Sequence, residues 1–353
     1  MKIERIRLGQ VPSPGLAGAV LTRDLDVTGE RWAKGRRLTS GDLERVGAAL
    51  PQAIGRPITV LVPEGGDIHE DDAARRIAQA VIGPGLTGGP PAQSRIDLRA
   101  THAGLARIDV RILDRLNSID TVEVFTILDG RIVEAGALVA SVKVAPHLVP
   151  ATVLAKVDRV ASASGKRGVV SVAPFLPRRV AAIVKESIRG IARDRFETSI
   201  RAKVEGLGSS LVGIDYVDDS VTPVATALNA RARGRSAGRA DLILTAGSGS
   251  TDPEDAFFVA IASLGGLILR HGIPAHPGSM LWLARVGRVP VIGLPSCGAY
   301  SKATAFDLLL PRLLAGEALT IRTVARLGHG GILTRDQRFR FPAYARDLDA
   351  PEG

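Results

Sequence analysis

The stretch DLILTAGSGSTDPED, which runs from Asp241 to Asp255, decides the fold. It begins as an apolar strand candidate, passes through glycines and hydroxyl-bearing residues, and reaches an acidic helix start at Asp252 and Pro253. A strand, a glycine-rich turn and a helix in this order form the repeating unit of an open parallel sheet covered by helices. In such sheets, ligands bind beyond the carboxyl ends of the strands. The residues that follow each strand are therefore the first candidates for a site.

The same alternation extends on both sides of this stretch. Apolar β-branched runs predict strands, and apolar residues at helical spacing predict helices, with Ser220 placed as an N-cap. The expected strands are 169–174, 210–217, 241–245, 267–272 and 289–295, and the expected helices are 178–205, 221–231, 253–264 and 299–314. We therefore expect a three-layer α/β domain with a mostly parallel sheet over residues 161–330, followed by a C-terminal tail over 331–353.

Residues 1–160 follow a different pattern, which predicts a β-rich α+β region. Short β-branched runs are separated by Gly, Pro and the pair Asp129-Gly130, which marks a hairpin turn. The expected strands are 58–63, 106–113, 121–128 and 137–146, with a helix over 70–82 and a loop over 83–94.

The composition excludes several classes of protein. Of 353 residues, 45% are hydrophobic and 23% are charged, which excludes a disordered, collagen-like or coiled-coil chain. Aromatic residues make up only 4%, which argues against a platform for stacking bases. The single cysteine, Cys297, excludes an internal disulfide framework and indicates a reducing compartment. Neither a secretory signal nor a membrane span is evident, so we expect a cytoplasmic protein.

The charge balance favours an anionic partner. The chain carries 46 basic and 36 acidic residues, for a net charge of +10. The densest basic stretch, from Lys166 to Lys203, is interpreted as a solvated helix face rather than a binding face. A phosphate-bearing small molecule fits this charge as well as nucleic acid does, so nucleic-acid binding rests on net charge alone.

The loop after 241–245 has the composition of a phosphate cradle. Gly247 and Gly249 let the backbone approach a ligand, and the following helix start adds a partial positive charge. The hydroxyl donors are Thr245, Ser248, Ser250 and Thr251. The loop lacks both the Gly-Lys-Ser/Thr end of a P-loop and the Gly-x-Gly-x-x-Gly of a dinucleotide site.

The acidic residues at this helix start have two interpretations. Asp252 is expected as the N-cap, with Pro253 as the first helical residue, and capping also explains Glu254. Carboxylates beside a phosphate loop can also hold Mg²⁺, with Asp252 and Asp255 as the candidate ligands. For Asp255 we prefer this functional role.

Two later loops also follow strands, and the three strand ends are expected to converge on one crevice. The candidate binding residues are Pro277, Gly278 and Ser279 in the second loop, and Gly293, Leu294, Pro295, Ser296 and Cys297 in the third. A helix start can lower the pKa of the Cys297 thiol. No His-Asp pair at a known spacing supports covalent catalysis, so we interpret Cys297 as a small loop residue, with a metal ligand as the alternative.

Three segments in this order resemble a known family: TAGSGSTDPED, GGLILRHGIPAHPGSM and GRVPVIGLPSCGAYS. They are similar to the molybdopterin-binding domain of molybdopterin molybdenumtransferases and their adenylyltransferase relatives. In that family the loops read Thr-Ser/Gly-Gly-Gly-x-Ser before an aspartate, then Pro-Gly-Lys-Pro, then Gly-Leu-Pro-Gly-Asn-Pro. The resemblance covers residues 165–320.

The resemblance implies roles for particular residues. Gly247, Ser248 and Ser250 would receive the molybdopterin phosphate, and Asp255 would match the acidic residue of the family. Departures are also present. The lysine of the second loop is Ser279, and the Asn-Pro of the third loop is Cys297-Gly298. The Thr-Gly-Asp-Glu after the first strand is absent, because the strand expected at 169–174 runs into Phe175-Leu176-Pro177.

The first half is similar to the region that precedes this domain in fusions with a cytidylyltransferase. The resemblance implies a homodimer, with Asn117 and Lys143 as candidates to face the crevice of a partner subunit, although turn and surface roles are more common for such residues. A cytidylyltransferase or a molybdoenzyme is the expected protein partner. An acidic cluster lies at Asp67, His69, Glu70, Asp71 and Asp72, and we favour helix capping over metal binding for it.

Three functions are carried forward. The preferred one is a molybdenum cofactor biosynthesis protein that binds molybdopterin or its nucleotide adduct and, if catalytic, inserts molybdenum from molybdate with Mg²⁺ and Asp255. The second is a carrier or sensor without chemistry, which the missing lysine and acidic pair favour. The third is nucleic-acid binding. His271 and His276 lie near the expected crevice, where a structural histidine is more usual than a ligand.

Overall fold

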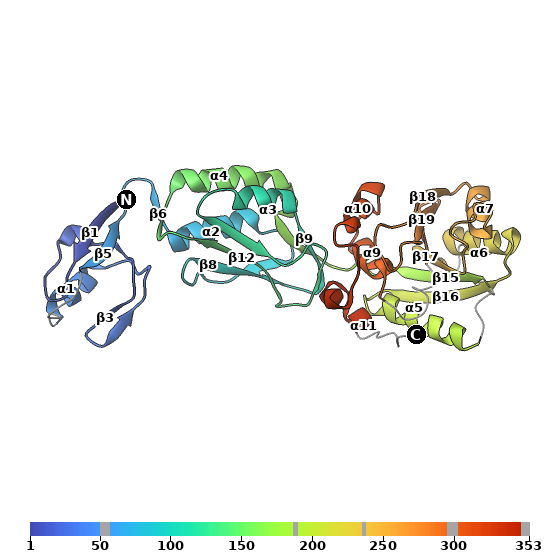
Figure 1. Cartoon of the computed structure of the whole chain (residues 1–353), viewed down its shortest axis with the longest axis horizontal. Helices are drawn as coiled ribbons and strands as arrows, with labels where there is room; N and C mark the ends of the chain where they lie inside the picture. The colour runs from blue at the N-terminus through green and yellow to red at the C-terminus, as the bar shows by residue number, and fades with distance from the viewer. Residues whose placement is uncertain (50–56, 186–189, 235–237, 295–302, 347–353) are drawn as a thin grey trace. The chain divides into compact units, whose positions relative to one another are not determined.

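The structure is a computed structural model that describes residues 1–49, 57–185, 190–234, 238–294 and 303–346. The chain divides into two compact units. The first unit consists of residues 1–129 and 133–172, and the second of residues 130–132 and the chain from Ala173 onward (Figure 1). The first unit has two separate hydrophobic cores, and the second has one core on each face of a six-stranded sheet.

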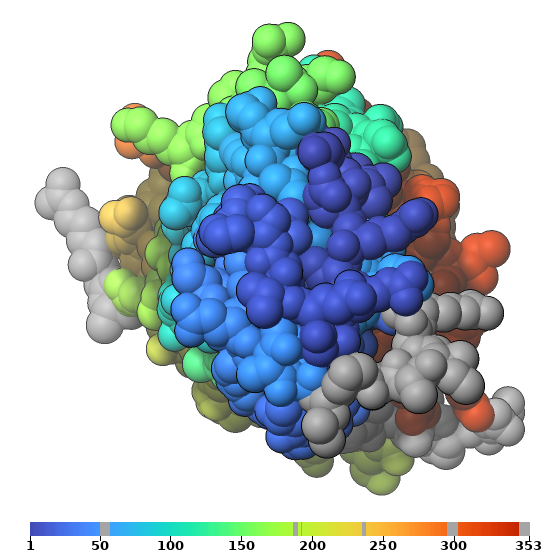
Figure 2. All heavy atoms as spheres, turned by 90° about the vertical axis from the view of Figure 1, so that its left-hand side faces the viewer, coloured from blue at the N-terminus to red at the C-terminus, as the bar shows by residue number. Residues whose placement is uncertain are grey.

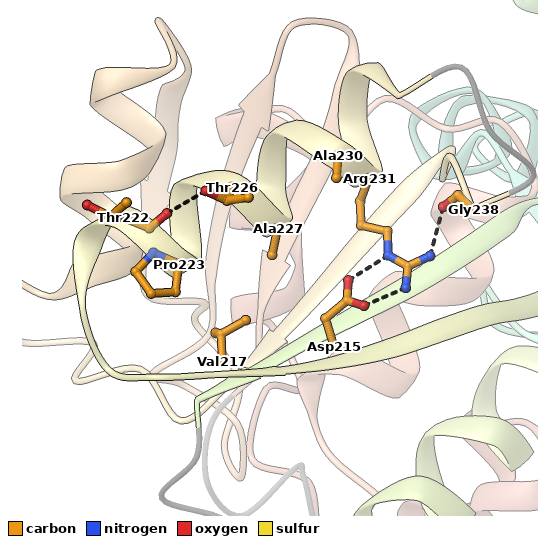
Figure 3. A pocket seen from close by; sticks show the side chains of 9 residues that line it. All are labelled: Asp215, Val217, Thr222, Pro223, Thr226, Ala227, Ala230, Arg231 and Gly238. Atoms are coloured by element: carbon orange, nitrogen blue, oxygen red, sulfur yellow. Dashed lines mark hydrogen bonds and ion pairs between the residues drawn. The ribbon is translucent and has the colours of Figure 1, made fainter.

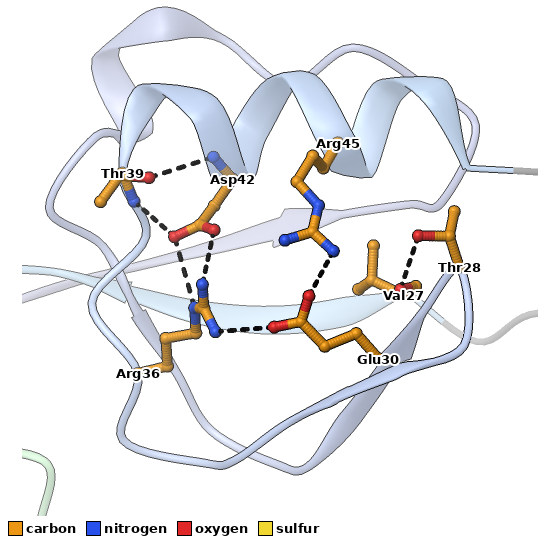
Figure 4. Close-up of polar contacts among 7 residues, drawn as sticks. All are labelled: Val27, Thr28, Glu30, Arg36, Thr39, Asp42 and Arg45. Carbon is orange, nitrogen blue, oxygen red and sulfur yellow. Dashed lines mark hydrogen bonds and ion pairs between the residues drawn. The ribbon is translucent and has the colours of Figure 1, made fainter.

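The N-terminal lobe, residues 1–49 and 57–62, packs small sheets and one helix around Trp32, which is fully buried. The guanidinium groups of Arg36 and Arg45 lie 4.4 and 5.1 Å from the centre of the Trp32 ring. Asp42 forms a capping box with Thr39 and accepts two hydrogen bonds from Arg36 (Figure 4). This lobe, drawn in dark blue, faces the viewer in Figure 2. Its elements are β1 (Lys2–Ile6), η1 (Pro14–Leu16), β2 (Val20–Leu21), β3 (Leu25–Val27), β4 (Glu30–Trp32), α1 (Ser40–Ala48) and β5 (Ile58–Val62).

The middle lobe, residues 67–129 and 133–172, is built on a four-stranded sheet of order β10-β12-β8-β7. Ala74, Ile77 and Val81 recur at helical spacing in α2 and are fully buried in the core of this lobe. Its elements are β6 (Asp67–His69), α2 (Glu70–Val81), β7 (Leu86–Gly88), β8 (Arg95–Ala100), β9 (Gly104–Ile108), α3 (Val110–Asn117), β10 (Val122–Thr126), β11 (Ile132–Val133), β12 (Leu138–Val144), β13 (Leu148–Pro150), α4 (Ala151–Ala161), η2 (Ser162–Arg167) and β14 (Val170–Ala173).

Two expectations for this lobe are corrected. The strand predicted over 106–113 ends at Ile108, and α3 follows because the Asp109 carboxylate accepts a hydrogen bond from the Ile112 backbone N–H and caps the helix. The tight hairpin predicted at Asp129-Gly130 is also wrong. The antiparallel strands β10 and β12 pair with each other, but the connection between them is longer and contains β11.

The second unit is a three-layer α/β domain, as predicted. Its sheet has the order β16-β15-β17-β20-β19-β18, in which β16, β15, β17 and β20 are parallel and β19 runs antiparallel to both of its neighbours, β20 and β18. Helices α6 and α7 cover one face, and α5 and α9 cover the other (Figure 1). The β-rich α+β character of the first unit also matches the expectation.

The bounds of the second unit place its loops at the strand ends. The elements are β15 (Arg179–Lys185), α5 (Ile191–Glu205), β16 (Ser210–Val217), α6 (Val221–Arg233), β17 (Leu242–Ala246), α7 (Ala256–Ser263), β18 (Leu267–His271), β19 (Trp282–Val286), β20 (Val289–Gly293), α9 (Ala305–Leu314), α10 (Ile321–Ala325), η3 (Arg326–Gly328), η4 (Arg335–Arg340) and α11 (Ala343–Arg346). Near the end of the chain, Phe341 and Ala345 are buried in the core on the α5 and α9 face.

Three expectations for this unit are wrong. The helix predicted over 178–205 is a strand, β15, followed by the shorter helix α5. A short continuous apolar run such as VAAIV fits a strand buried on both faces as well as a helix, so periodicity alone does not separate the two. The strand at 169–174, which corresponds to β14, lies in the sheet β11-β9-β14 and is not the first strand of this domain. Strand β19 was not predicted.

None of the helices in the described part of the chain combines the length and the apolar character that a membrane span requires.

Candidate functional site

The three candidate loops meet at one edge of the six-stranded sheet, and strand register brings them there. Thr245, near the end of β17, pairs with Gly293 at the end of the parallel strand β20. Gly293 in turn pairs with Trp282, the first residue of the antiparallel strand β19, which follows the second loop. The Leu294 N–H donates to the Thr245 carbonyl over 2.8 Å and joins the first and third loops.

Asp255 holds the first loop in place through its carboxylate. Its carboxylate accepts hydrogen bonds from the Gly249 N–H at 2.6 Å and the Phe257 N–H at 2.9 Å. Asp255 is therefore the N-cap of α7, a role that we expected of Asp252. The loop residues Gly247 and Gly249 are exposed, and Gly247 has a φ of 87°, which a side chain would rarely adopt. The cap thus folds the loop back over the start of α7 while leaving its glycines open to solvent.

Lys185 brings a buried positive charge to the same point. Its side chain is 3% exposed, and its Nζ donates to Asp255 Oδ2 and to Asp219 Oδ1, both at 2.7 Å. Burial opposes the charged form, but the hydrogen bonds to the two carboxylates outweigh it and raise the pKa of Lys185 above its usual value. The ammonium also lies 5.4 Å from the centre of the Phe257 ring. Lys185 is therefore a cation held at the end of β15.

Trp282 holds the first loop through a hydrogen bond. Its indole Nε1–H donates to Ser248 Oγ at 3.0 Å, so the fully buried ring positions a hydroxyl that we expected to bind the ligand. A Cβ on Gly293 would lie 1.9 Å from Trp282 Cε2, so the position at which the third loop begins has room only for glycine. Of the other predicted hydroxyl residues in this loop, Ser250 is partly exposed and Thr251 is exposed.

The second loop packs against the start of α9. The Pro277 carbonyl accepts from the Ala305 N–H at 2.9 Å. Gly278 has a φ of 102°, and a Cβ there would lie 2.9 Å from Ala305 N. The Ser279 carbonyl accepts from the Ile273 N–H at 2.8 Å and closes the loop. These contacts fix the backbone of Pro277, Gly278 and Ser279 through α9.

The start of α9 repeats the arrangement found at α7. Asp307 forms a capping box with Thr304, and both residues are fully buried. Lys203 Nζ, also fully buried, donates to the two carboxylate oxygens of Asp307 at 2.6 and 2.8 Å. Asp255 at the N-cap of α7 and Asp307 in the first turn of α9 are therefore each paired with a buried lysine.

Thr245 is a buried polar group without a partner. Its side chain is fully buried, and Oγ1 has no hydrogen-bond partner among the described residues. Ile183 pairs with Thr245 across β15 and β17, and Lys185 lies two residues further along β15, so the side chains of Lys185 and Thr245 lie on the same face of the sheet. A buried hydroxyl left unpaired costs free energy, and this one lies on the same face of the sheet as the cation of the site.

The described part of the third loop consists of Gly293 and Leu294. Pro295, Ser296 and Cys297 lie outside the described residues, as does the segment that follows β15. Gly293 and Leu294 are buried at the end of β20.

The carboxylates do not fit a Mg²⁺ site in this arrangement. Asp255 directs its two oxygens at backbone N–H groups and at Lys185, and the Oδ1 atom of the exposed Asp252 accepts from the Glu254 N–H. Among the described residues, no group of three or more His, Cys, Asp or Glu side chains could hold a metal ion. In this arrangement Asp255 binds the start of α7 and Lys185, and Asp252 binds the backbone of Glu254.

The candidates of the first unit have structural contacts. The side-chain amide of Asn117 exchanges two hydrogen bonds with the backbone of Val124, and Lys143 is a partly buried residue of β12. At the acidic cluster, His69 caps α2 by accepting from the Asp71 N–H, and Asp72 pairs with Arg37 and Arg75. Glu70 Oε2 lies 3.0 Å from His147 Nδ1, and Asp67 is bound by the N-terminal amine. These contacts are those of helix capping and ion pairing.

The two histidines near the site also have structural environments. His271 packs edge-on against Phe258, with ring centres 5.1 Å apart. The backbone of His276 exchanges hydrogen bonds with Gly331 and Leu333.

A separate pocket of about 690 Å³ lies between the edge strand β16 and α6 (Figure 3). Arg231 donates twice to the Asp215 carboxylate, both times at 2.6 Å, and once to the Gly238 carbonyl at 2.9 Å. The hydrogen bonds to Asp215 raise the pKa of Arg231 above its usual value. The polar groups of this pocket are therefore bound to one another, and none of its lining residues belongs to the three loops.

Sequence reasoning missed Lys185, Asp219 and Trp282. Lys185 and Asp219 follow the apolar runs of β15 and β16, so the search of strand ends that identified the other candidates applies to them also. Lys185 was missed because β15 was interpreted as helix. Trp282 was missed because β19 was not predicted, and no pattern in the sequence indicates its contact with Ser248.

Residues 179–315 match a protein-family model described as a probable molybdopterin binding domain. The chain is also similar to the molybdopterin biosynthesis moea protein from Pyrococcus horikosii, at 16% identity, over 74% of this chain and 81% of that chain, with a TM-score of 0.29. A second similar structure is molybdenum cofactor biosynthesis protein B, at 14% identity, over 45% of this chain and 99% of that chain, with a TM-score of 0.29. No curated protein matches the sequence. The resemblance predicted from the three motifs is confirmed, and it holds for residues 179–315.

Proposed function

We propose that this edge of the sheet binds molybdopterin, or its nucleotide adduct, and holds it by its phosphate. The family match supports a role in molybdenum cofactor biosynthesis and spans the described parts of the three loops. Gly247, Ser248 and Gly249 supply backbone and hydroxyl groups to the phosphate, and Pro277 and Gly278 form the adjoining wall. The third loop completes the site through Gly293 and Leu294.

The observation that carries this proposal is the way the first loop is held. Asp255 binds the Gly249 N–H and Lys185, and Trp282 binds Ser248, so contacts within the protein hold the loop while its glycines are exposed. A loop that is ordered in advance loses little conformational entropy when it binds. The loop also lies at the start of α7, where the helix dipole favours an anion.

Two roles for Asp255 are compatible with this function. As a positioning residue, it holds the loop and Lys185, which its contacts support directly. As the residue that positions metal during molybdenum insertion, it would need a carboxylate oxygen directed at the ligand. The contacts therefore support binding of the pterin more strongly than insertion, and a carrier or sensor remains the alternative to a molybdenumtransferase.

Calorimetric titration with molybdopterin, and with a pterin that lacks the phosphate, tests the proposal. We expect saturable binding of molybdopterin and much weaker binding of the phosphate-free compound. Equal affinities would exclude the phosphate as the recognised group. Absence of binding by both compounds would contradict the proposed function.

The Asp255→Asn variant separates the two roles, with Asp252→Asn as the control. If Asp255 positions the loop, the variant loses molybdopterin affinity because the ion pair with Lys185 is lost. If it acts on the metal, affinity is unchanged and only molybdenum incorporation from molybdate falls. Absence of incorporation in the intact protein, with binding retained, would make the chain a carrier or sensor.

A further inference from the structure

The two carboxylates bound to Lys185 differ in how firmly they are held. Asp255 has a side chain that is 3% exposed and is fixed by two backbone N–H groups as well as by the lysine. Asp219 has a side chain that is 62% exposed, and Lys185 Nζ is its one hydrogen-bond partner among the described residues. The Asp255 carboxylate is therefore held in place by the protein, whereas the Asp219 carboxylate contacts the ammonium from the solvent side.

An exposed carboxylate can leave this position at low cost. Ion pairs that are open to water contribute little to stability, because water solvates the carboxylate almost as well as its partner does. The Lys185 ammonium is buried and keeps Asp255 as a partner when Asp219 moves, and an anion can then accept the hydrogen bond that Asp219 gives up. An oxyanion supplies the same acceptor atoms and the same sign of charge.

Thr245 provides a second, independent indication of a ligand. Its hydroxyl is fully buried, has no hydrogen-bond partner among the described residues, and lies on the same face of the sheet as Lys185. A hydroxyl can donate a hydrogen bond to an oxyanion.

We infer that Lys185 is the cationic contact for a tetrahedral oxyanion at this edge, and that the Asp219 carboxylate occupies the oxyanion's place until the ligand displaces it. The inference deepens the proposed function and rests on it for the location of the ligand. The oxyanion is either the phosphate monoester of a bound pterin or free molybdate, since both present tetrahedral oxygen acceptors. Asp219 then lowers the oxyanion affinity by competing for Lys185, and Lys185 raises it by contacting the oxyanion directly.

The test is calorimetric titration of the full chain with inorganic phosphate and, separately, with molybdate, at constant ionic strength. The central variant is Asp219→Asn, which removes the competing charge at an exposed position and is compatible with folding. We expect about tenfold tighter oxyanion binding, the size of one charge-assisted hydrogen bond. Asp218→Asn is the matched control, since it removes the same charge from the neighbouring exposed residue and should leave affinity unchanged.

The Lys185→Met variant provides the opposite expectation, a loss of oxyanion affinity of at least about tenfold. The inference is overturned if neither phosphate nor molybdate binds any of these proteins. It is also overturned if Asp219→Asn and Asp218→Asn have the same oxyanion affinity. A preference for phosphate over molybdate would assign the site to the phosphate monoester, and the reverse preference to the metal oxyanion.

Titration of the same proteins with molybdopterin separates this inference from the proposed function. If the unmodified chain binds molybdopterin but oxyanion affinity does not change in Asp219→Asn, the inference fails and the proposed function stands. If Asp219→Asn binds oxyanions more tightly while no protein binds molybdopterin, the oxyanion site stands and the proposed ligand is removed.

Discussion

Gly293 occupies a position where a side chain has no room, because the ring of Trp282 fills the space that a Cβ would take. The same ring donates to Ser248, so one small residue determines where the first loop lies. At this scale the site depends on a few contacts between residues of different strands. The sequence shows the residue types but not these contacts.

The Gly293→Ala variant should lose stability and ligand affinity together. The added Cβ must displace Trp282, and overpacking of this kind costs about 1–3 kcal/mol. Urea denaturation measures the loss in the free energy of unfolding. Gly65→Ala is the control, because a Cβ there meets no atom within 4 Å. Equal stability of the two variants would contradict the close contact with Trp282.

The Thr245→Val variant should separate binding from stability. Replacing an unpaired buried hydroxyl with a methyl group of similar size is close to neutral, or stabilising, for folding. If the hydroxyl donates to the ligand, the variant should bind molybdopterin about tenfold more weakly. Thr226→Val, at an exposed position of α6, is the control. Full affinity in Thr245→Val would show that the hydroxyl does not contact the ligand.

At the scale of elements, the helices α7 and α9 each have a carboxylate, at the N-cap or in the first turn, that is paired with a buried lysine. Asp255 pairs with Lys185 from β15, and Asp307 pairs with Lys203 from α5. Each pair fixes a helix start, and the α9 start supports the backbone of the second loop through Ala305. We interpret the pairs as the devices that hold the candidate loops in place.

The Lys203→Met variant should be strongly destabilised. It leaves the Asp307 carboxylate buried without its cation, which costs about 3–5 kcal/mol. Adding Asp307→Asn should recover part of the loss, because the remaining group is neutral. The control on the same helix is Arg201→Met, which removes an exposed pair with Glu205. Chemical denaturation measures all four proteins, and a similar effect of Lys203→Met and Arg201→Met would contradict this account.

The sequence predicts most of the second unit at this scale, and the exceptions have physical causes. The strands β16, β17 and β20 are bounded by polar or glycine-rich turns, so their ends could be assigned. Strand β15 is buried on both faces and lacks the alternation that marks a strand. In the first unit, α3 follows β9 after one residue, and its amphipathic spacing becomes visible only with Asp109 as the cap.

The candidate site could be predicted in part for similar reasons. Glycines, hydroxyls and Asp255 follow a recognisable strand, so their position at the sheet edge follows from the fold class. The partners that hold them come from other strands. Lys185, Trp282 and Asp219 reach the loop through side-chain contacts between distant segments, which a single sequence does not specify.

At the scale of the whole molecule, the chain consists of two units, and we propose that the second is the ligand-binding domain. Its described loops, both its cores and the family match from 179 to 315 all lie within it. The boundary between the units follows Val172, whereas the sequence suggested a change near residue 160.

A fragment that begins at Ala173 should therefore fold independently and bind molybdopterin with the affinity of the full chain. It lacks only residues 130–132 of the second unit. Circular dichroism and calorimetric titration measure these two properties. A folded fragment that does not bind would show that the first unit supplies part of the site, and an unfolded fragment would contradict the proposed boundary.

The most direct test of the central claim is a titration of tryptophan fluorescence with molybdopterin. The chain has two tryptophans, and Trp282 contacts the first loop whereas Trp32 lies in the core of the N-terminal lobe. We predict a saturable change that persists in Trp32→Phe and disappears in Trp282→Phe. No saturable change in the unmodified protein, or a change that comes from Trp32 alone, would contradict the claim that molybdopterin binds at the loops held by Asp255 and Trp282.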